Sequence, residues 1–423
     1  MLQPLCLALL SALTAGLGTS AGAETLRIAT PAALQQALLA PSPGDVLLLA
    51  PGNYGQLDLR GLVMPPDQPL VLRGADQGGP AVMTGMRLSS VENLVLENLT
   101  FDYTYAPGDP GHLRPFQIND SQGITIRHSV FDGDVARGVS AESDGFGTAF
   151  GLSLRGSARI TLDDSEIRGF FRGLMVSESS DILVRGNDLH DIRMDGMNFA
   201  QVEHVRIEDN HIHDFARSLT SGDHADMIQF WTNGTTAPSR DIVITGNVLN
   251  SGAGWYTQSI FMRNDQVDRG LAGPEMFYRD VLITQNVIIN AHLHGIAIGE
   301  TDGLTISNNT VIRNARSEGA DDNVALWNPR ISVAETSRRV QILRNVVSRI
   351  AGYDNQDDWV VADNMFVQDQ GRLEAGLFYD LAFVDARSGD PQNLGSFSYL
   401  PGGALDGAGV GAERLAGLQP VVP

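Results

Sequence analysis

The feature that most constrains the fold of this chain is a repeated motif of alternating apolar residues that ends in asparagine. Two earlier copies carry Ser129 and Ser165 at the asparagine position. Successive copies are 22 or 23 residues apart at some places and 36 to 39 residues apart at others. A period in this range predicts a solenoid, in which each repeat buries its apolar face against the next. The copies that carry asparagine are Ile182–Asn187, Val205–Asn210, Ile242–Asn247, Val281–Asn286, Leu304–Asn309 and Val340–Asn345.

Each repeat is predicted to consist of strands, because its apolar residues alternate at a period of two and no long helical stripe is present. A coil of three short strands, stacked on copies of itself, is a parallel β-helix. We therefore predict an all-β, single-stranded parallel β-helix of about ten coils. An inward asparagine at one corner can bond to the coils above and below. The inward pairs of the third strand are predicted to be Leu152/Leu154, Leu174/Val176, Met197/Phe199, Ile228/Phe230, Ile260/Met262, Ile296/Ile298 and Val324/Leu326.

The ends of the chain fit the same architecture. A short amphipathic helix over residues 30–39 is expected to cover the N-terminal end of the stack, where an unpaired strand edge invites aggregation. We expect the β-helix domain to span residues 24–365 and a closing segment, residues 366–423, to pack on it. The segment Gly44–Tyr54 resembles the first coil of the pectate-lyase-like superfamily. This resemblance implies a right-handed β-helix.

Residues 1–23 are expected to form a signal peptide and not part of the fold. A mostly apolar run over residues 5–18 precedes Ala21-Gly22-Ala23, a small-x-small pattern typical of signal-peptidase sites. We therefore expect export to the periplasm or the extracellular medium. The single cysteine, Cys6, lies in this segment, so the mature chain is expected to have no disulfide and no thiol chemistry. No second apolar stretch is long enough to span a membrane.

The charge of the chain excludes several functions. The formal net charge is −21, which disfavours nucleic-acid binding because such binding relies on basic charge facing phosphate. All 29 basic residues are arginine, so lysine cannot serve as a catalytic base, a Schiff-base former or a phosphate-binding cation. We expect a monomer without a nucleic-acid partner.

The long coils gain their extra residues beside the third strand. These insertions include residues 133–147, 216–222, 232–239 and 265–277. Loops on both sides of one sheet build walls, and the groove between them fits an extended polymer. We therefore expect the functional site on the third strand and at the corner before it.

Ionisable residues gather at that corner. One column, followed from coil to coil, is predicted to contain Arg172, Asp195, Asp226, Gln258, His294 and Asp322. The column two residues earlier contains Arg193, His224, Tyr256 and His292. Outward positions on the strand include Asn198, Gln229, Trp231 and Arg263. The string Ser221–Gln229, which contains His-Ala-Asp-Met-Ile-Gln, resembles strings in secreted carbohydrate-active β-helix proteins.

The predicted role of Asp195 and Asp226 depends on the direction in which their side chains point. Strict alternation from Met197 and Ile228 would turn both carboxylates inward, where unpaired charge is costly. Either the corner breaks the alternation and they face the groove, or they are paired structural groups. On adjacent coils the carboxyls would lie roughly 5 Å apart. This separation suits a retaining glycosidase pair, a shared proton or a Ca²⁺ site.

Each of the other candidate residues has both a functional and a structural interpretation. His224 and Tyr256 can act as general acid or base. His292 and His294 can bind substrate or hold the turn, and the histidine spacing matches no recognised zinc motif. The remaining candidates are substrate-binding groups with packing or ion pairing as the alternative: Arg172, Arg193 and Arg263 for a uronate carboxylate, Trp231 as a sugar platform, and Asn198 and Gln229 on the strand.

Together these residues predict a secreted enzyme that modifies a polysaccharide, with an acidic glycan as the leading substrate. Uronate β-elimination and C5-epimerisation both need the carboxylate neutralised and the C5 proton removed, for which arginine, Asp-held Ca²⁺, His and Tyr are suitable. The alternatives are a glycoside hydrolase that uses Asp195 and Asp226, a non-catalytic glycan-binding β-helix, and a structural surface protein.

The set of Asp, His, Tyr and Arg on a β-helix is similar to that of mannuronan C5-epimerases. Their Asp-Pro-His string is absent, because Asp223-His224 lacks the proline. The alginate and chondroitin lyase family of this fold relies on a lysine base. Close membership in that family is unexpected, since this chain has no lysine.

Overall fold

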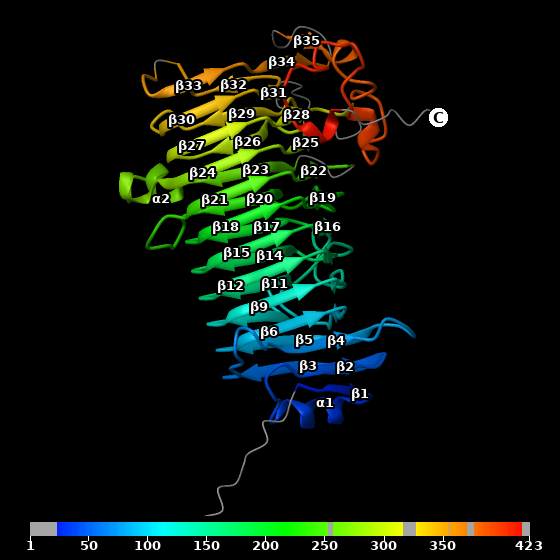
Figure 1. Cartoon of the computed structure of the whole chain (residues 1–423). Coiled ribbons are helices and arrows are strands. Elements are labelled where there is room, and N and C mark those ends of the chain that lie inside the picture. The colour runs from blue at the N-terminus through cyan, green and yellow to red at the C-terminus, as the bar shows by residue number, and fades with distance from the viewer. Residues whose placement is uncertain (1–22, 253–256, 316–326, 355, 370–375, 417–423) are drawn as a thin grey trace, which may run out of the picture.

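The chain forms a stack of coils, most of which contribute one strand to each of three faces (Figure 1). The structure is a computed structural model and describes residues 23–252, 257–315, 327–354, 356–369 and 376–416. Every pairing between its neighbouring coils is parallel, so the fold is a parallel β-helix, as predicted. No helix in these ranges is long and apolar enough to cross a membrane.

The first face is a sheet of 13 strands, so the stack is longer than the ten or so coils predicted. Most coils outside the predicted repeats lie at the N-terminal end, where the asparagine is absent, and one more, which carries Asn364, lies at the C-terminal end. The strands are β1 (Thr25–Ile28), β2 (Val46–Leu49), β4 (Leu70–Gly74), β6 (Glu92–Glu97), β9 (Gln122–Arg127), β12 (Ala158–Asp163), β15 (Ser180–Arg185), β18 (Glu203–Glu208), β21 (Arg240–Thr245), β24 (Tyr278–Thr284), β27 (Thr301–Ser307), β30 (Arg338–Leu343) and β33 (Trp359–Ala362).

The second and third faces share a sheet of 22 strands. The second face contains β7 (Thr100–Asp102), β10 (Val130–Asp132), β13 (Glu166–Arg168), β16 (Asp188–His190), β19 (His211–His213), β22 (Val248–Asn250), β25 (Val287–Ile289), β28 (Thr310–Ile312), β31 (Val346–Val347), β34 (Met365–Gln368) and β35 (Leu377–Phe378). The third face contains β3 (Gly52–Arg60), β5 (Ala81–Ser89), β8 (Phe116–Asn119), β11 (Phe150–Arg155), β14 (Arg172–Ser177), β17 (Met197–Ala200), β20 (Asp226–Trp231), β23 (Gln258–Arg263), β26 (His294–Ile298), β29 (Arg330–Val333) and β32 (Ile350–Ala351).

The helices are few and short. Helix α1 (Pro31–Leu38) lies at the N-terminal end of the stack (Figure 1), and its Leu34 is buried in the core. Helix α2 (Asp265–Asp268) and the 3₁₀ turn η1 (Pro274–Met276) lie in the long loop after β23. The C-terminal segment contains η4 (Tyr379–Leu381), η5 (Leu394–Phe397) and η6 (Glu413–Leu415), and it packs against apolar side chains of the second face.

The asparagines of the motif form a continuous ladder at the corner between the first and second faces. Asn247 shows the pattern: its Nδ2 and its backbone N–H both donate to Oδ1 of Asn286, at 2.9 and 3.0 Å. Its own Oδ1 accepts the same pair of bonds from Asn210. The prediction that this side chain bonds the coils on both sides is therefore confirmed. The ladder runs through Asn187, Asn210, Asn247, Asn286, Asn309, Asn345 and Asn364.

Alternation breaks at the start of β20 on the third face. Ala225, Met227 and Ile228 are all buried in the core cluster, so two consecutive residues, Met227 and Ile228, face the interior. Other coils place a small residue at the Met227 position, for example Gly196. This break turns the preceding residue, Asp226 in this coil, to the outside of the helix. The corner therefore breaks the alternation, as one alternative expected, but both carboxyls are buried and paired, as the other alternative expected, and they do not face a groove.

Gly196, which takes the place of Met227 in the preceding coil, has no room for a side chain. A Cβ there would lie 2.6 Å from the backbone oxygen of Met227 and 3.1 Å from the ring of Phe215. We expect Gly196→Ala to lower the free energy of unfolding by about 1–3 kcal/mol, as other overpacking substitutions do. Gly222→Ala is the control, because a Cβ at Gly222 meets nothing within 4 Å. Equal urea midpoints for the two variants would contradict the packing described here.

Candidate functional site

A column of polar residues runs along the outside of the third face. Leu174 pairs with Met197 and Met197 with Ile228, which places Arg172, Asp195 and Asp226 on successive coils. The column continues through Gln258 and His294, because Asp226 pairs with Gln258 and Ile260 with Ile296. This part of the column is as predicted.

The column ends differently from the prediction. His294 pairs with Arg330, not with Asp322, which lies outside the described residues together with Val324 and Leu326. The inward pair of this coil is Ile331 and Val333, opposite Ile296 and Ile298. The cause is the length of the loop after β28, which the sequence pattern does not reveal. An arginine therefore stands where a carboxylate was expected.

Asp195 and Asp226 lie in a buried hydrogen-bonded network. Both side chains are 0% exposed. Oδ2 of Asp195 lies 3.0 Å from Nε of Arg172 and accepts from Nδ2 of Asn198 at 3.1 Å, while Oδ1 accepts from the backbone N–H of Asp226. Nε2 of Gln229 donates to Oδ2 of Asp226 at 2.5 Å. Asn198 and Gln229, both predicted as outward residues, therefore lock the two carboxyls in place.

The two carboxyls share one positive partner, Arg172. Burial raises the pKa of Asp226 well above its usual value, and the neighbouring charge of Asp195 raises it further. Burial also raises the pKa of Asp195, but Arg172 and Asn198 oppose this. The first proton to leave the pair therefore comes from Asp195, and Asp226 keeps the second. Of the predicted roles for this pair, a shared proton fits best.

The same contacts argue against Ca²⁺ at this pair. Ca²⁺ takes six to eight oxygen ligands. Three of the four carboxyl oxygens already face N–H groups, from Arg172, Asn198, Gln229 and the backbone. Only Oδ1 of Asp226 has no hydrogen-bond partner within the described part of the chain. The residues as arranged do not fit a Ca²⁺ site. They do not fit a glycosidase pair either, because no substrate oxygen reaches a fully buried carboxyl.

Arg172 is held between aromatic rings above this pair. Its guanidinium carbon lies 5.3 Å from the ring centroid of Trp231 and 5.5 Å from that of Phe150. Trp231 also lines a cavity of about 200 Å³ on the third face, together with Arg155, Gln201 and others. The guanidinium of Arg172 is therefore engaged by the carboxyl pair, whereas the ring of Trp231 faces the cavity on the third face.

The predicted histidines meet in a second cavity, of about 330 Å³, farther along the same face. Its lining includes the exposed His224, the buried His292 and the half-buried His294, together with Gln258 and Arg217. The loops before β20 and β26 build its wall. Sequence analysis placed these three histidines in neighbouring columns, and the structure brings them together.

The two less exposed histidines of this cavity, His292 and His294, are neutral at ordinary pH. Burial, helped by the charges of His294, Arg217 and His224, lowers the pKa of His292 to about 3. Burial and Arg330 lower the pKa of His294 to about 4. Nδ1 of His294 donates to Oε1 of Gln258, which leaves Nε2 with a lone pair. No described residue hydrogen-bonds to this Nε2.

Three predicted site residues lie apart from this cavity or cannot be placed. Arg193 is buried and donates to Asp223 at 2.8 Å, so the ion-pair alternative describes it. Arg263 donates to Asp268 at 2.9 Å and lines a neighbouring cavity that it shares with His294. Tyr256 lies outside the described residues.

Sequence analysis missed two residues of the site. Arg217 was not singled out, although it lies in the 216–222 insertion that was expected to form a wall. Gln258 was placed in the column without a role, and it fixes the tautomer of His294. Arg217 could have been found as a basic residue in an insertion that was expected to form a wall of the groove. The contact of Gln258 with His294, in contrast, is revealed only by the fold.

Comparison with known protein families agrees with this architecture. The profile of the family described as "Right handed beta helix region" matches residues 116–354. An alginate lyase from Paenibacillus sp. str. FPU-7 is 14% identical, with 84% of this chain and 97% of that chain covered and a TM-score of 0.39. The adhesin PfbA of Streptococcus pneumoniae is 14% identical (79% and 92% covered, TM-score 0.47), and the periplasmic alginate epimerase AlgG is also 14% identical (84% and 82% covered, TM-score 0.43). No curated protein sequence matches the chain.

Proposed function

Because this chain belongs to the right-handed β-helix family and its third face carries cavities lined by polar side chains, we propose that it removes the C5 proton of a uronate residue in an acidic polysaccharide. The outcome is β-elimination or C5-epimerisation. The supporting observation is the histidine cavity, which combines an unprotonated imidazole with an arginine on the wall of the groove.

The proposed base is His294. At neutral pH its Nε2 carries a lone pair, and Gln258 holds the ring through Nδ1. Deprotonation next to a carboxylate requires that the carboxylate charge is neutralised. Arg217, which lines the same cavity, is the proposed partner for that charge. Arg172 lies four coils away from His294, or about 19 Å along the stack, so it cannot serve the same sugar.

The remaining proton transfer is assigned to His224. Its imidazole is exposed at the rim of the cavity, where it can reach the far side of a bound sugar. In epimerisation a proton returns to C5 on the opposite face; in elimination a proton goes to the leaving oxygen. Tyr256 remains a predicted alternative for this step. We also propose export of the chain, since its polymeric substrate would lie outside the cytoplasm.

The direct test is incubation of the purified chain with a panel of uronate polymers in D₂O. Elimination gives absorbance near the ultraviolet edge, epimerisation gives deuterium at C5 by NMR, and hydrolysis gives reducing ends without either. We expect His294→Gln to lower the rate about a hundredfold or more. His204→Gln is the control, because His204 is exposed on the first face. Its rate is expected to equal that of the parent chain.

The pH profile provides a second readout. A base with a pKa of about 4 is unprotonated above that pH, so the acid limb of kcat/KM is expected near pH 4 and not near 6.5. Retention on a uronate polymer without any product would identify a glycan-binding protein. An unchanged rate in His294→Gln would place the base elsewhere.

A further inference from the structure

A separate histidine cluster lies on the outside of the second face, away from the groove. The rings of His190, His211 and His213 stack: the centroids of His211 and His213 are 4.0 Å apart, and those of His190 and His213 are 5.1 Å apart. His211 and His213 lie two residues apart on β19 and therefore project from the same side of the strand.

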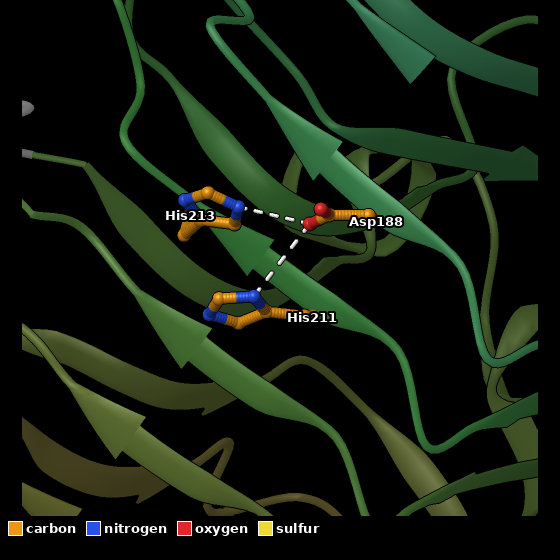
Figure 2. Close-up of side chains that lie close together, drawn as sticks. All are labelled: Asp188, His211 and His213. Atoms are coloured by element: carbon orange, nitrogen blue, oxygen red, sulfur yellow. Dashed lines mark hydrogen bonds and ion pairs between the residues drawn. The ribbon is translucent and has the colours of Figure 1, made fainter. Parts of the chain in front are cut away.

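The neighbouring coil adds a carboxylate to these two rings. Asp188 pairs with His211 across β16 and β19. Its Oδ1 lies 2.9 Å from Nε2 of His213 and 3.6 Å from Nδ1 of His211, so both rings converge on one oxygen (Figure 2). The three ligand atoms lie within 4.8 Å of one another.

Two of these separations are close to those between the ligands of a tetrahedral metal ion. Zn²⁺ binds nitrogen and carboxylate oxygen at about 2.0–2.2 Å, which places any two ligands of a tetrahedron about 3.3–3.5 Å apart. The two distances from Asp188 lie on either side of this value, so small rotations of exposed side chains suffice. His211 and Asp188 have this freedom, because their side chains are 43% and 50% exposed.

A second carboxylate orients the ligand ring. Nδ1 of His213 lies 2.7 Å from Oδ2 of Asp214, on the side of the ring opposite to Asp188. Metal-binding histidines almost always donate their other N–H to such a group, which fixes the tautomer that presents a lone pair. Asp214 in turn accepts a hydrogen bond from Gln392 of the C-terminal segment.

We propose that Asp188, His211 and His213 bind a first-row divalent metal ion, with Zn²⁺ as the expected occupant and water as the fourth ligand. Two imidazoles and one carboxylate favour Zn²⁺ over Ca²⁺ or Mg²⁺, which prefer oxygen ligands. The ion would join two adjacent coils and, through Asp214 and Gln392, would hold the C-terminal segment. This site is independent of the polysaccharide chemistry in the groove.

The competing explanation is a metal-free cluster in which His213 is an imidazolium between two carboxylates. Burial lowers the pKa of this imidazole, but hydrogen bonds to Asp188 and Asp214 raise it to about 9. An imidazolium explains why His213 contacts both carboxylates. It does not account for His211, whose Nδ1 also faces Asp188, whereas a shared ion explains both rings.

The test is a titration of the EDTA-treated, untagged chain with Zn²⁺ by calorimetry. We expect one ion per chain and a rise in the thermal midpoint, because a ligand that binds only the folded chain stabilises it. Co²⁺ serves as a spectroscopic probe, with the intense visible bands of a four-coordinate ion expected. His211→Ala is expected to abolish the Zn²⁺ shift in midpoint, and Asp214→Asn to weaken binding about 10–100-fold.

Two control variants keep the test specific. His204→Ala removes an exposed histidine that also lies near carboxylates, and His294→Ala removes one from the groove cavity. Both are expected to keep the full Zn²⁺ response. The proposal is overturned if the parent chain shows no saturable binding, or if His211→Ala binds Zn²⁺ as tightly as the parent chain. A loss of binding in His294→Ala alone would move the site to the groove.

Discussion

Asp195→Asn is expected to lower the free energy of unfolding at pH 7 by about 3 kcal/mol. The substitution leaves the guanidinium of Arg172 without its partner at 3.0 Å, in a place where the arginine side chain is only 18% exposed. Breaking a buried ion pair by removing one partner costs this much, because the remaining charge stays uncompensated. Urea unfolding followed by circular dichroism measures the change.

The matched variant, Asp226→Asn, is expected to behave differently. Burial and the charge of Asp195 raise the pKa of Asp226 well above its usual value and so favour its protonated form, which asparagine replaces with a neutral group of the same shape that can still accept from Gln229. Its cost at pH 7 is expected to be below about 1 kcal/mol. Asp67→Asn, at an exposed position, is the control for removal of a carboxylate. Equal losses for the variants of Asp195 and Asp226 would contradict this assignment of the proton.

The two variants also differ in their pH dependence, and the sign follows from the raised pKa of Asp226. In the unfolded chain this carboxyl ionises near pH 4, whereas in the folded chain it ionises only at a much higher pH. The parent chain therefore loses stability as the pH rises above about 4. Asp226→Asn removes this loss, so its stability relative to the parent chain is expected to increase with pH.

The asparagine ladder is the second place where a single substitution is expected to have a large effect. Asn247→Ala is expected to lower the free energy of unfolding by about 4 kcal/mol. Asn247 is 0% exposed, and its Oδ1 accepts both the backbone N–H and Nδ2 of Asn210. Truncation leaves the backbone N–H of Asn210 without its partner and removes one of the two bonds of Nδ2 of Asn210 and one of the two that Oδ1 of Asn286 accepts. An unsatisfied buried group costs about 1–3 kcal/mol, and each lost hydrogen bond adds to this.

A graded set of substitutions tests the ladder. Asn247→Ser is expected to cost less, because Ser165 holds the same position and accepts from the backbone of Ser129 while it donates to its own strand. Asn233→Ala, at an exposed turn, is expected to change the stability by less than about 0.5 kcal/mol. If Asn247→Ala had no larger effect than Asn233→Ala, the ladder would not stabilise the stack.

The sequence predicted the architecture because the repeat is a local and periodic signal. Alternation at a period of two and the recurring asparagine can be recognised in the sequence without any knowledge of tertiary contacts. The strands, the ladder and the inward pairs from Leu152 to Ile298 were predicted from these two signals. The count of coils was low because the first coils lack the asparagine and because the copy that ends in Asn364 was not among the predicted repeats. The last inward pair was wrong because one loop is longer than the pattern indicated.

The candidate site was predicted only in part, both in its residues and in its arrangement. The column from Arg172 to His294 was correct, since stacked coils keep the register. The burial of the carboxyl pair, which removes it from contact with a substrate, depends on the broken alternation at Met227 and on the cover supplied by Asn198 and Gln229. Neither is visible in a pattern of alternating residues.

The sequence by itself therefore determined the stack, its corner ladder and the polar column, because these depend on spacing along the chain. The tertiary structure decided which groups meet and which remain charged. It placed Arg217 and Gln258 beside His294, and it joined Asp188 to two histidines of the next coil. The physical reason is that protonation and ligand geometry depend on burial and on distances between coils, and both depend on loops whose course the repeat does not specify.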